Sequence, residues 1–320
     1  MVDLPGETSG DVLLIVAQSW GSGSPELRIR SLRERSSLVS AEGFSINYRV
    51  EDRARWHCPG RVPFRAGLGD YVDCFNPPQR QGSSQGKTCV NCAVAEATLA
   101  GSLHHAHLRD PEELDADVAA HLLQPNVLYL AVFRDGSMKV GTSSIHRTEK
   151  RWLEQGAWMA VAVAEASDGI VVRRLEDLVT ERLGISQSVG IRRKVAGLTS
   201  PVADEALSES LKQSVGDVHR LVSELGPAGI DQAEEFWSNP LVGSPAADRL
   251  KLYPADPRRD SHHFTIEAMV GRTALIHRGG PNQAEVATDR FVLDLGVLHG
   301  LELTRGDFEP VELAVQDSLF

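Results

Sequence analysis

Four cysteines supply the clearest chemistry in the sequence, and all of them lie within a short stretch of the 320 residues. Cys89 and Cys92 form a C-x2-C pair, a spacing that directs two thiolates toward one ion. Cys58 and Cys74 are single cysteines that could complete a tetrahedral set of ligands. Zinc suits four thiolates, or a mixture of sulfur and nitrogen ligands. The sequence therefore predicts a structural zinc site.

The surroundings of the cysteines favour a metal but leave its ligand set open. From Trp56 to about His107 the sequence has no apolar periodicity, so something other than a hydrophobic core must hold it, and a bound metal would do so. Reduced, buried cysteines without a metal are one alternative, and a catalytic thiol or an iron–sulfur cluster is another. Histidines in the same stretch could replace a thiolate, namely His57, His104, His105 and His107.

The charge of the chain is unevenly distributed. The net charge of -11 argues against a protein coated for nucleic acid, because phosphate binding depends on Lys and Arg. Residues 125–195 are different: they hold eleven Lys and Arg against eight Asp and Glu. This basic region within an acidic chain is compatible with an anionic substrate.

The sequence also bears on location. The N-terminus has no basic region, and no apolar run approaches the roughly 18 residues that a membrane-spanning helix needs. We therefore expect a cytoplasmic protein with no membrane partner, and in a reducing compartment clustered cysteines favour metal over disulfide. The sequence leaves the oligomeric state open.

The elements after the cysteines follow a regular order. Residues 127–133 read as a strand, Asp135-Gly136 as a hairpin turn, and residues 138–141 as the returning strand. A helix then runs to Gly156, residues 157–164 form a third strand, and apolar residues at helical spacing predict a second helix that ends at Gly184. The order is hairpin, helix, strand, helix.

The whole chain is expected to be α+β, with an apolar fraction of 42% that is ordinary for a globular protein. We expect five segments: an antiparallel β-region at residues 1–55, a Cys/His-rich zinc-binding segment at 56–123, the ββαβα module at 124–200, a connecting helix at 201–226, and a C-terminal β-domain at 227–320. The last segment reads as a small β-barrel or sandwich.

Residues over nearly the full length resemble the bacterial family called domain of unknown function 2797. The matching segments are Tyr71…Cys74-Phe75, Gln124-Pro125…Leu128-Tyr129-Leu130-Ala131, Lys139-Val140-Gly141-Thr142, Arg151-Trp152…Gln155-Gly156-Ala157, Glu267-Ala268-Met269-Val270-Gly271 and Phe291-Val292-Leu293-Asp294. That family has more cysteines in this region than the present chain, which implies one metal site here rather than two.

The module itself resembles the GIY-YIG nuclease superfamily over about residues 127–184. The resemblance implies a catalytic set in which Tyr129 matches the first motif tyrosine and Lys139 stands at the second. It also implies that Arg151, with Arg147 as its rival, is the arginine of the first helix. Glu176 matches the glutamate that holds a divalent ion, Mg or Mn. Gly141 matches the closing glycine of the motif.

Physical reasoning gives these residues both a catalytic and an ordinary interpretation. Phosphodiester hydrolysis needs an activated water, a cation on the phosphate oxygens and help for the leaving group. Helical spacing places Glu176 at the border of the buried stripe, where either a metal ligand or a salt-bridged glutamate would lie. Tyr129 could equally be a core residue, and Lys139 a solvated one.

The favoured function is a metal-dependent phosphodiesterase or nuclease that acts on DNA or RNA. One alternative is a non-catalytic, zinc-containing nucleic-acid-binding protein. Another is an enzyme that acts on a small molecule in a biosynthetic pathway, an option that the acidic overall charge favours.

Overall fold

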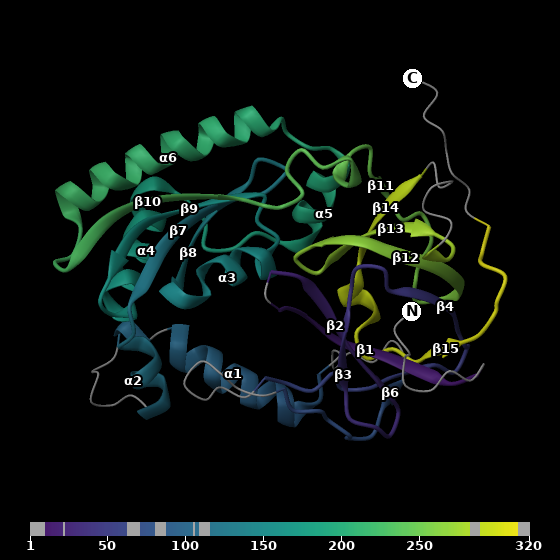
Figure 1. Ribbon diagram of the computed structural model, residues 1–320. Helices are drawn as coiled ribbons and strands as arrows, with labels where there is room; N and C mark the ends of the chain where they lie inside the picture. Colours follow the sequence, from purple (N-terminus) through teal and green to yellow (C-terminus); the bar gives the residue numbers. More distant parts are fainter. Residues whose placement is uncertain are drawn as a thin grey trace. The chain divides into compact units, whose positions relative to one another are not determined.

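The computed structural model describes residues 10–21, 23–62, 71–80, 88–104, 106–108, 116–281 and 289–312. The chain divides into two compact units (Figure 1). The first consists of Met1–Arg61, Tyr71–Ala93 and Asp248–Phe320, and the second of Val62–Asp70 and Val94–Ala247.

The first unit is built on a nine-stranded sheet that joins strands from both ends of the chain. In Figure 1 the purple strands come from the N-terminal part and the yellow-green strands from the C-terminal part. The strand order is β11 (Lys251–Leu252), β14 (Arg290–Asp294), β13 (Thr273–Arg278), β12 (Asp260–Val270), β4 (Ser45–Val50), β15 (Leu303–Arg305), β1 (Val12–Trp20), β2 (Pro25–Ser31) and β3 (Ser37–Ser40).

Pairing between β4 and β12 corrects the separation that we expected between residues 1–55 and 227–320. The two strands are antiparallel, with Ser45 opposite Thr265 and Val50 opposite Asp260. In β4 the alternating residues Ile46, Tyr48 and Val50 are buried, which matches the period-two pattern of the sequence. The N-terminal and C-terminal strands thus share one core.

The C-terminal strands do not close into a barrel of their own. In the described part of the chain, the nine-stranded sheet runs from the edge strand β11 to the edge strand β3, without a pairing that joins the two. Short strands such as these limit the unpaired backbone that a sheet edge exposes. The expected small barrel is therefore not found.

The second unit contains the hairpin–helix–strand–helix order that the sequence predicts. Its elements are β7 (Asn126–Val132), β8 (Met138–Ser144), α3 (Thr148–Gln155), β9 (Met159–Ala166) and α4 (Gly169–Leu183). The helix ends follow local chemistry: the Asp168 side chain accepts hydrogen bonds from the Ile170 and Val171 N–H groups, both at 2.9 Å. Gly156 and Gly184 end α3 and α4 in the left-handed conformation.

The sheet of this unit has a fourth strand that the sequence assigned to the C-terminal domain. β10 (Ile230–Ser238) pairs with β9, which gives the order β10-β9-β7-β8. β7 is buried along its whole length because it lies inside the sheet with helices packed against it. The structure therefore extends this unit to Ala247, beyond the boundaries at 200 and 226 that we expected.

The remaining helices surround this sheet or lead into it. α6 (Asp204–Leu225) contacts β9, β7 and β10, and it also contacts α4 (Figure 1). α5 (Ile191–Thr199) was not expected from the sequence. Short elements complete the described chain, namely β5 (Arg55–Trp56), β6 (Gln79–Arg80), α2 (Ala116–Leu122), and the 3-10 turns η1 (Ala106–Leu108), η3 (Ile145–Arg147), η4 (Pro245–Ala247) and η6 (Leu295–Leu298).

The cysteine-rich stretch contains a helix that its lack of periodicity concealed. α1 (Val90–His104) begins directly after Cys89, so Cys92 lies in its first turn. Its sequence is rich in alanine, the strongest helix former, and alanine produces a helix without a marked apolar stripe. Of the helices that the structure describes, none has the length and apolarity that crossing a membrane requires.

Candidate functional site

The four cysteine sulfurs converge within the first unit. Cys58 lies after β5, Cys74 between β5 and β6, Cys89 before α1 and Cys92 in its first turn. The four Sγ atoms lie within 4.8 Å of one another, and the side chains of Cys58, Cys89 and Cys92 are buried. Residues separated by up to 34 positions in sequence are thus brought together, as the sequence predicts.

The distances fit a metal better than a disulfide. Sulfurs bound to one zinc ion at about 2.3 Å lie about 3.8 Å apart at tetrahedral angles. Cys74 Sγ and Cys89 Sγ are 3.7 Å apart, and all four cysteines are free. A disulfide needs sulfurs about 2.05 Å apart. The cluster could therefore hold a metal such as zinc.

Hydrogen-bond donors favour the thiolate form of Cys89, whereas burial raises the pKa of Cys58 and of Cys92. The Cys89 N–H donates to Cys58 Sγ at 3.3 Å, and the Asn76 amide donates to Cys89 Sγ at 3.1 Å. Burial opposes ionisation of Cys89, but hydrogen bonds from the Cys92 N–H and from Asn76 outweigh it and lower the pKa of Cys89 to about 6. The donor set is thus suited to binding a cation.

The histidines do not join this cluster where the structure describes them. The Nε2 atom of His57 lies 2.8 Å from Glu302 Oε1, and the Nε2 atom of His107 lies 2.8 Å from Asp177 Oδ2. The side chain of His104 and the whole of His105 lie outside the described residues. Among the described residues, the group that could hold a metal consists of four cysteines without a histidine.

A second constellation lies in the second unit, around Glu176. β7 contributes Tyr129, β8 contributes Lys139, α3 contributes Arg151, and α4 contributes Glu176. The charges of Lys139, Arg151 and Arg173 act on the Glu176 carboxyl group, and the charge of Glu176 acts on Tyr129. Four of the five catalytic residues predicted from the sequence therefore come together.

Arg147, the fifth, does not join them. It lies in η3, and its guanidinium pairs with Glu154 at 3.3 Å on an exposed part of the surface. Arg151 is one helical turn further along the chain, and its guanidinium reaches the side chains of Tyr129 and Gln155. Between the two rival arginines, the structure favours Arg151.

Tyr129 is fully buried and acts on the site through Gln155. Its ring packs edge-on against Trp152, and its hydroxyl is 2.9 Å from the Gln155 amide. When the Gln155 oxygen faces Arg151, it accepts from Nε at 2.9 Å and Nη2 at 3.1 Å, while the amide nitrogen donates to Tyr129. Tyr129 thus positions Gln155, and Gln155 positions Arg151.

Gly141 leaves the space that the Tyr129 ring occupies. The two residues are opposite each other in the β7–β8 ladder. A Cβ at position 141 would lie 2.5 Å from Tyr129 Oη, 2.6 Å from Cζ and 3.1 Å from Lys139 Cε. The glycine is therefore required by the packing of the Tyr129 and Lys139 side chains.

We expect Gly141→Ala to lower the free energy of unfolding by about 1–3 kcal/mol, because the added methyl group overpacks this contact. Denaturant unfolding measures the change. Gly216→Ala is the matched control, since no heavy atom lies within 4 Å of its added Cβ and alanine favours the α6 helix. Equal stability of the two variants would contradict this explanation of Gly141.

Glu176 is a buried carboxylate without a direct partner among the described residues. Its side chain is only 8% exposed, yet in the described part of the chain it makes no hydrogen bond and no ion pair within 4.0 Å. Burial raises its pKa, while the charges of Arg173 and Lys139 oppose the rise. Such a carboxylate is available to a ligand.

Lys139 is equally buried, at 8% exposure, and it faces the same space. Burial, reinforced by repulsion from Arg151 and opposed by attraction from Glu176, lowers the pKa of Lys139 to about 8. Its ammonium lies 5.8 Å from the centre of the Tyr129 ring. A lysine in this state can exchange a proton near neutral pH.

Arg173 and Gln155 were not identified from the sequence. Arg173 precedes Glu176 by three residues on α4, which puts the two on one face of the helix. The three-residue spacing from Glu176 is the feature of the sequence that could have identified Arg173. The adjacent Arg174 hid it, because two arginines stand side by side there. Gln155 gave no signal, because its role depends on the packing of α3 against β7.

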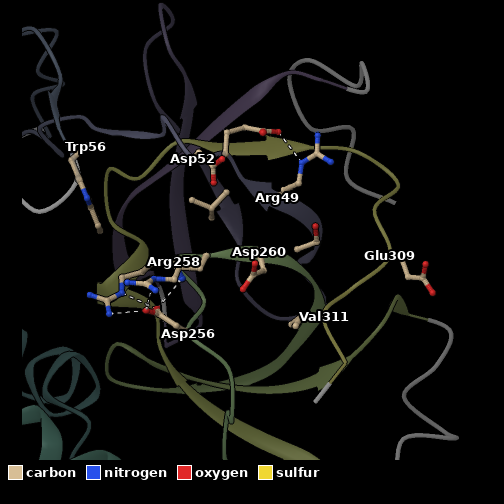
Figure 2. A pocket seen from close by; sticks show the side chains of 12 residues that line it. Arg49, Asp52, Trp56, Asp256, Arg258, Asp260, Glu309 and Val311 are labelled. Atoms are coloured by element: carbon tan, nitrogen blue, oxygen red, sulfur yellow. Dashed lines mark hydrogen bonds and ion pairs between the residues drawn. The ribbon is translucent and has the colours of Figure 1, made fainter. Parts of the chain in front are cut away.

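The first unit also has an open pocket of about 1100 Å³, at the end of β4 and the start of β12 (Figure 2). Its arginines are engaged by neighbouring carboxylates: Arg258 bonds Asp256 at 2.8 Å, and Arg49 bonds Glu51 at 2.8 Å. Asp52, Asp260 and Glu309 add negative charge around it. None of the sequence-predicted site residues lines this pocket.

Comparison with known families matches residues 67–244 to the family described as "Protein of unknown function (DUF2797)". This match covers more than half of the chain. The chain belongs to this family. The match is shorter than the near-full-length resemblance expected from the sequence, and it ends before the C-terminal strands of the first unit. It includes three of the four cysteines and every residue around Glu176.

Neither the curated proteins nor the solved structures contain a match to this sequence.

Proposed function

We propose that the constellation around Glu176 is the active site of a metal-dependent phosphodiesterase that acts on DNA or RNA. One observation carries the proposal: within the described part of the chain a buried carboxylate has no hydrogen bond or ion pair, and the charges of Arg173, Lys139 and Arg151 act on it. The resemblance of the ββαβα module to GIY-YIG nucleases supports the same reading. Together they describe a site for an anion and a divalent ion.

The charges suit a phosphodiester. A phosphodiester carries negative charge on its non-bridging oxygens, and more charge develops there during attack by water. Arg151 is held by Gln155, and the charges of Arg151 and Lys139 act on the Glu176 carboxyl group from α3 and β8. Arginine matches phosphate with paired N–H donors. These cations bind the substrate and stabilise the charge that develops on it.

Lys139 is a better proton acceptor than Tyr129. Tyr129 is 0% exposed, its hydroxyl bonds Gln155, and burial raises its pKa. Lys139 has a lowered pKa and a side chain in the space near Glu176. We propose that Lys139 accepts the proton of the attacking water, while Tyr129 keeps Arg151 in place.

Glu176 fits a ligand for Mg²⁺ or Mn²⁺. Magnesium is commonly held by one or two carboxylates together with substrate phosphates, and Glu176 offers one such carboxylate. A bound divalent ion would supply charge stabilisation for the phosphate and lower the pKa of a water molecule. Glu176 would orient it next to the anion that Arg151 holds.

We propose zinc as the metal of the cysteine cluster, with Cys58, Cys74, Cys89 and Cys92 as its ligands. The spacing of the sulfurs and the N–H donors around them support four thiolates on one ion. Its role is structural, since four protein ligands leave no open position for a substrate. A cytoplasmic location would keep these thiols reduced.

The proposal is tested by incubating the purified full-length chain with labelled single-stranded and double-stranded DNA and RNA, with Mg²⁺, with Mn²⁺ or with EDTA. We expect cleavage that requires the divalent ion and is lost in Arg151→Ala. Arg147→Ala is the matched control, because Arg147 lies apart from Glu176 and pairs with Glu154. Cleavage by the Arg151→Ala variant would contradict the assignment of the active site to the constellation around Glu176.

The pH dependence of cleavage tests the role of Lys139. Because its pKa is about 8, the ammonium form predominates below that pH and cannot accept a proton, whereas the amine predominates above it. We expect kcat to rise with pH and to level off above about pH 8. Lys139→Met should lower kcat by about 10²-fold or more and remove this rise.

The lowered pKa of Lys139 also predicts how the free energy of unfolding depends on pH. The unfolded chain keeps the Lys139 proton up to the ordinary pKa of 10.5, whereas the folded chain releases it near 8. The unfolded state therefore binds more protons between these values, and the contribution of Lys139 to the free energy of unfolding rises with pH across that window. Lys139→Met should remove this rise.

Non-catalytic nucleic-acid binding is the second candidate, and the buried hydroxyl of Tyr129 favours it. A tyrosine that is closed off from substrate and a lysine at the second motif position would bind phosphate without hydrolysis. This function predicts salt-sensitive binding that does not need a divalent ion. An enzyme that acts on a phosphorylated small molecule would instead show turnover that oligonucleotides do not inhibit.

A further inference from the structure

Arg173 is the residue of the Glu176 constellation whose position calls for an explanation. It lies on α4, one helical turn before Glu176, and its side chain is partly buried. Arginine is seldom withdrawn from water unless a partner compensates the charge. Groups around Arg173 must therefore offset the free-energy cost of partly removing its charge from water.

The described protein groups do not supply a direct partner. In that part of the chain the Arg173 guanidinium makes no hydrogen bond and no ion pair within 4.0 Å, although the charges of Glu176, Asp177 and Arg151 reach it. Asp177 is engaged elsewhere, with His107 at 2.8 Å and with Gln187 at 2.8 Å. Five N–H donors of Arg173 are left for another acceptor.

The charges around Arg173 are mixed: Glu176 and Asp177 attract its guanidinium, whereas Arg151 repels it. Arg151 and Lys139 both act on Glu176 from other elements, so three cations surround one buried carboxylate. Repulsion between Arg151 and Arg173 works against holding them together. An anion placed among these side chains would offset that repulsion and accept the guanidinium N–H groups.

We propose that Arg173 is a phosphate-binding residue that shares the anion of the substrate with Arg151 and Lys139. The inference rests on the proposed function for the class of substrate, a nucleic-acid phosphate. It adds a second arginine, from α4 rather than α3. With two arginines on different helices, the site can hold a phosphate from two sides in paired N–H geometry.

The neighbouring Arg174 provides a matched control. It is the same residue type on the same helix, it is exposed, and its charge is not among those that act on Glu176, Lys139 or Tyr129. A general effect of removing one positive charge from this helix would be equal at the two positions. An effect that is specific to the site would appear only at Arg173.

The experiment measures binding of a fluorescent single-stranded oligonucleotide to the full-length chain in buffer without added divalent ion, over a range of salt concentrations. Thermal unfolding with and without inorganic phosphate is measured in parallel. We expect Arg173→Gln to raise Kd about 10-fold or more and to reduce the salt slope by about one phosphate contact. Arg173→Gln should also abolish the stabilisation by phosphate, and Arg173→Lys should restore part of that stabilisation. Arg174→Gln should leave Kd, the salt slope and the stabilisation by phosphate close to their wild-type values.

Two results would overturn the inference. One is equal binding by the Arg173→Gln and Arg174→Gln variants. The other is a lower Tm for Arg173→Gln with unchanged binding, which would make Arg173 a structural partner of Glu176 and Asp177. Failure of the proposed hydrolysis is distinguishable, because the oligonucleotide and phosphate measurements are made without a divalent ion. If anion binding depends on Arg173 but the chain cleaves no nucleic acid, this inference is supported and the proposed nuclease activity is contradicted.

Discussion

Glu176→Gln is expected to lower metal-dependent cleavage by at least about 10²-fold, because it removes the carboxylate charge that would hold the divalent ion. Glutamine keeps the volume of the side chain and the packing of α4. The loss should therefore appear in kcat measured at saturating substrate, while oligonucleotide binding without added divalent ion is kept or strengthened. Stronger binding would follow from removing a negative charge beside the phosphate.

The same substitution is expected to leave the protein at least as stable as the wild type. Burial raises the pKa of Glu176 above its ordinary value of 4.5, so the folded state binds the proton more tightly than the unfolded state. The contribution of this group to the free energy of unfolding therefore falls as pH rises from 4.5 through the raised folded pKa. At neutral pH the ionised carboxylate is a cost that glutamine removes.

Loss of activity with retained or increased stability separates a functional carboxylate from a structural one. Chemical unfolding at neutral pH, together with single-turnover cleavage, gives the two quantities. Glu181→Gln is the matched control, since Glu181 is an exposed residue of the same helix and, within the described residues, its ion pair is with Arg182 at 3.9 Å. If Glu176→Gln instead loses stability and keeps activity, Glu176 is a buried ion-pair residue and not a metal ligand.

Removal of the metal from the cysteine cluster is expected to have the second large effect. We expect about one zinc per purified chain, lost in Cys89→Ser, because Cys89 Sγ lies at the centre of the contacts with Cys74 and Asn76. A ligand present at 1,000 times its Kd stabilises a folded state by about 4 kcal/mol. Loss of zinc should lower the stability of the first unit by an amount of this order.

The effect should be concentrated around the cysteines. The nine-stranded sheet has its own buried residues and its own strand pairing, whereas the backbone around Cys74 and Cys89 has few regular elements apart from β6 and the start of α1. Chelation or Cys89→Ser should therefore open this stretch to limited proteolysis before the sheet unfolds. Metal analysis and peptide mapping after proteolysis measure the two parts of the prediction.

Asn91→Ser tests whether the loss of zinc and of resistance to proteolysis results from removing a thiolate. Asn91 is an exposed residue between Cys89 and Cys92, so this variant changes the same turn without removing a ligand. It should keep its zinc and its resistance to proteolysis. Purification of the wild type without a metal, and with the same proteolysis pattern in EDTA, would falsify the assignment of the cluster as a metal site.

The sequence by itself determined the local elements and the candidate residues. The Asp-Gly turn, the helix-ending glycines and the apolar spacing predicted the order β7, β8, α3, β9 and α4, because each signal acts over a few residues. The C-x2-C spacing predicted that Cys89 and Cys92 share a site. The position of Glu176 at the border of an apolar stripe separated it from Asp177, which is exposed.

Only the tertiary structure decided which residues meet. Arg147 and Arg151 are equivalent in sequence, and the packing of α3 against β7 brings Arg151 to Tyr129 through Gln155. Arg173 lies near Glu176 and Arg151 because α4 packs against β8 and β7. Likewise, pairing of β4 with β12, and of β10 with β9, joined segments that local patterns had separated. Such pairings depend on contacts between residues far apart in the chain, and side-chain periodicity shows which face of a strand is buried but not which strand lies beside it.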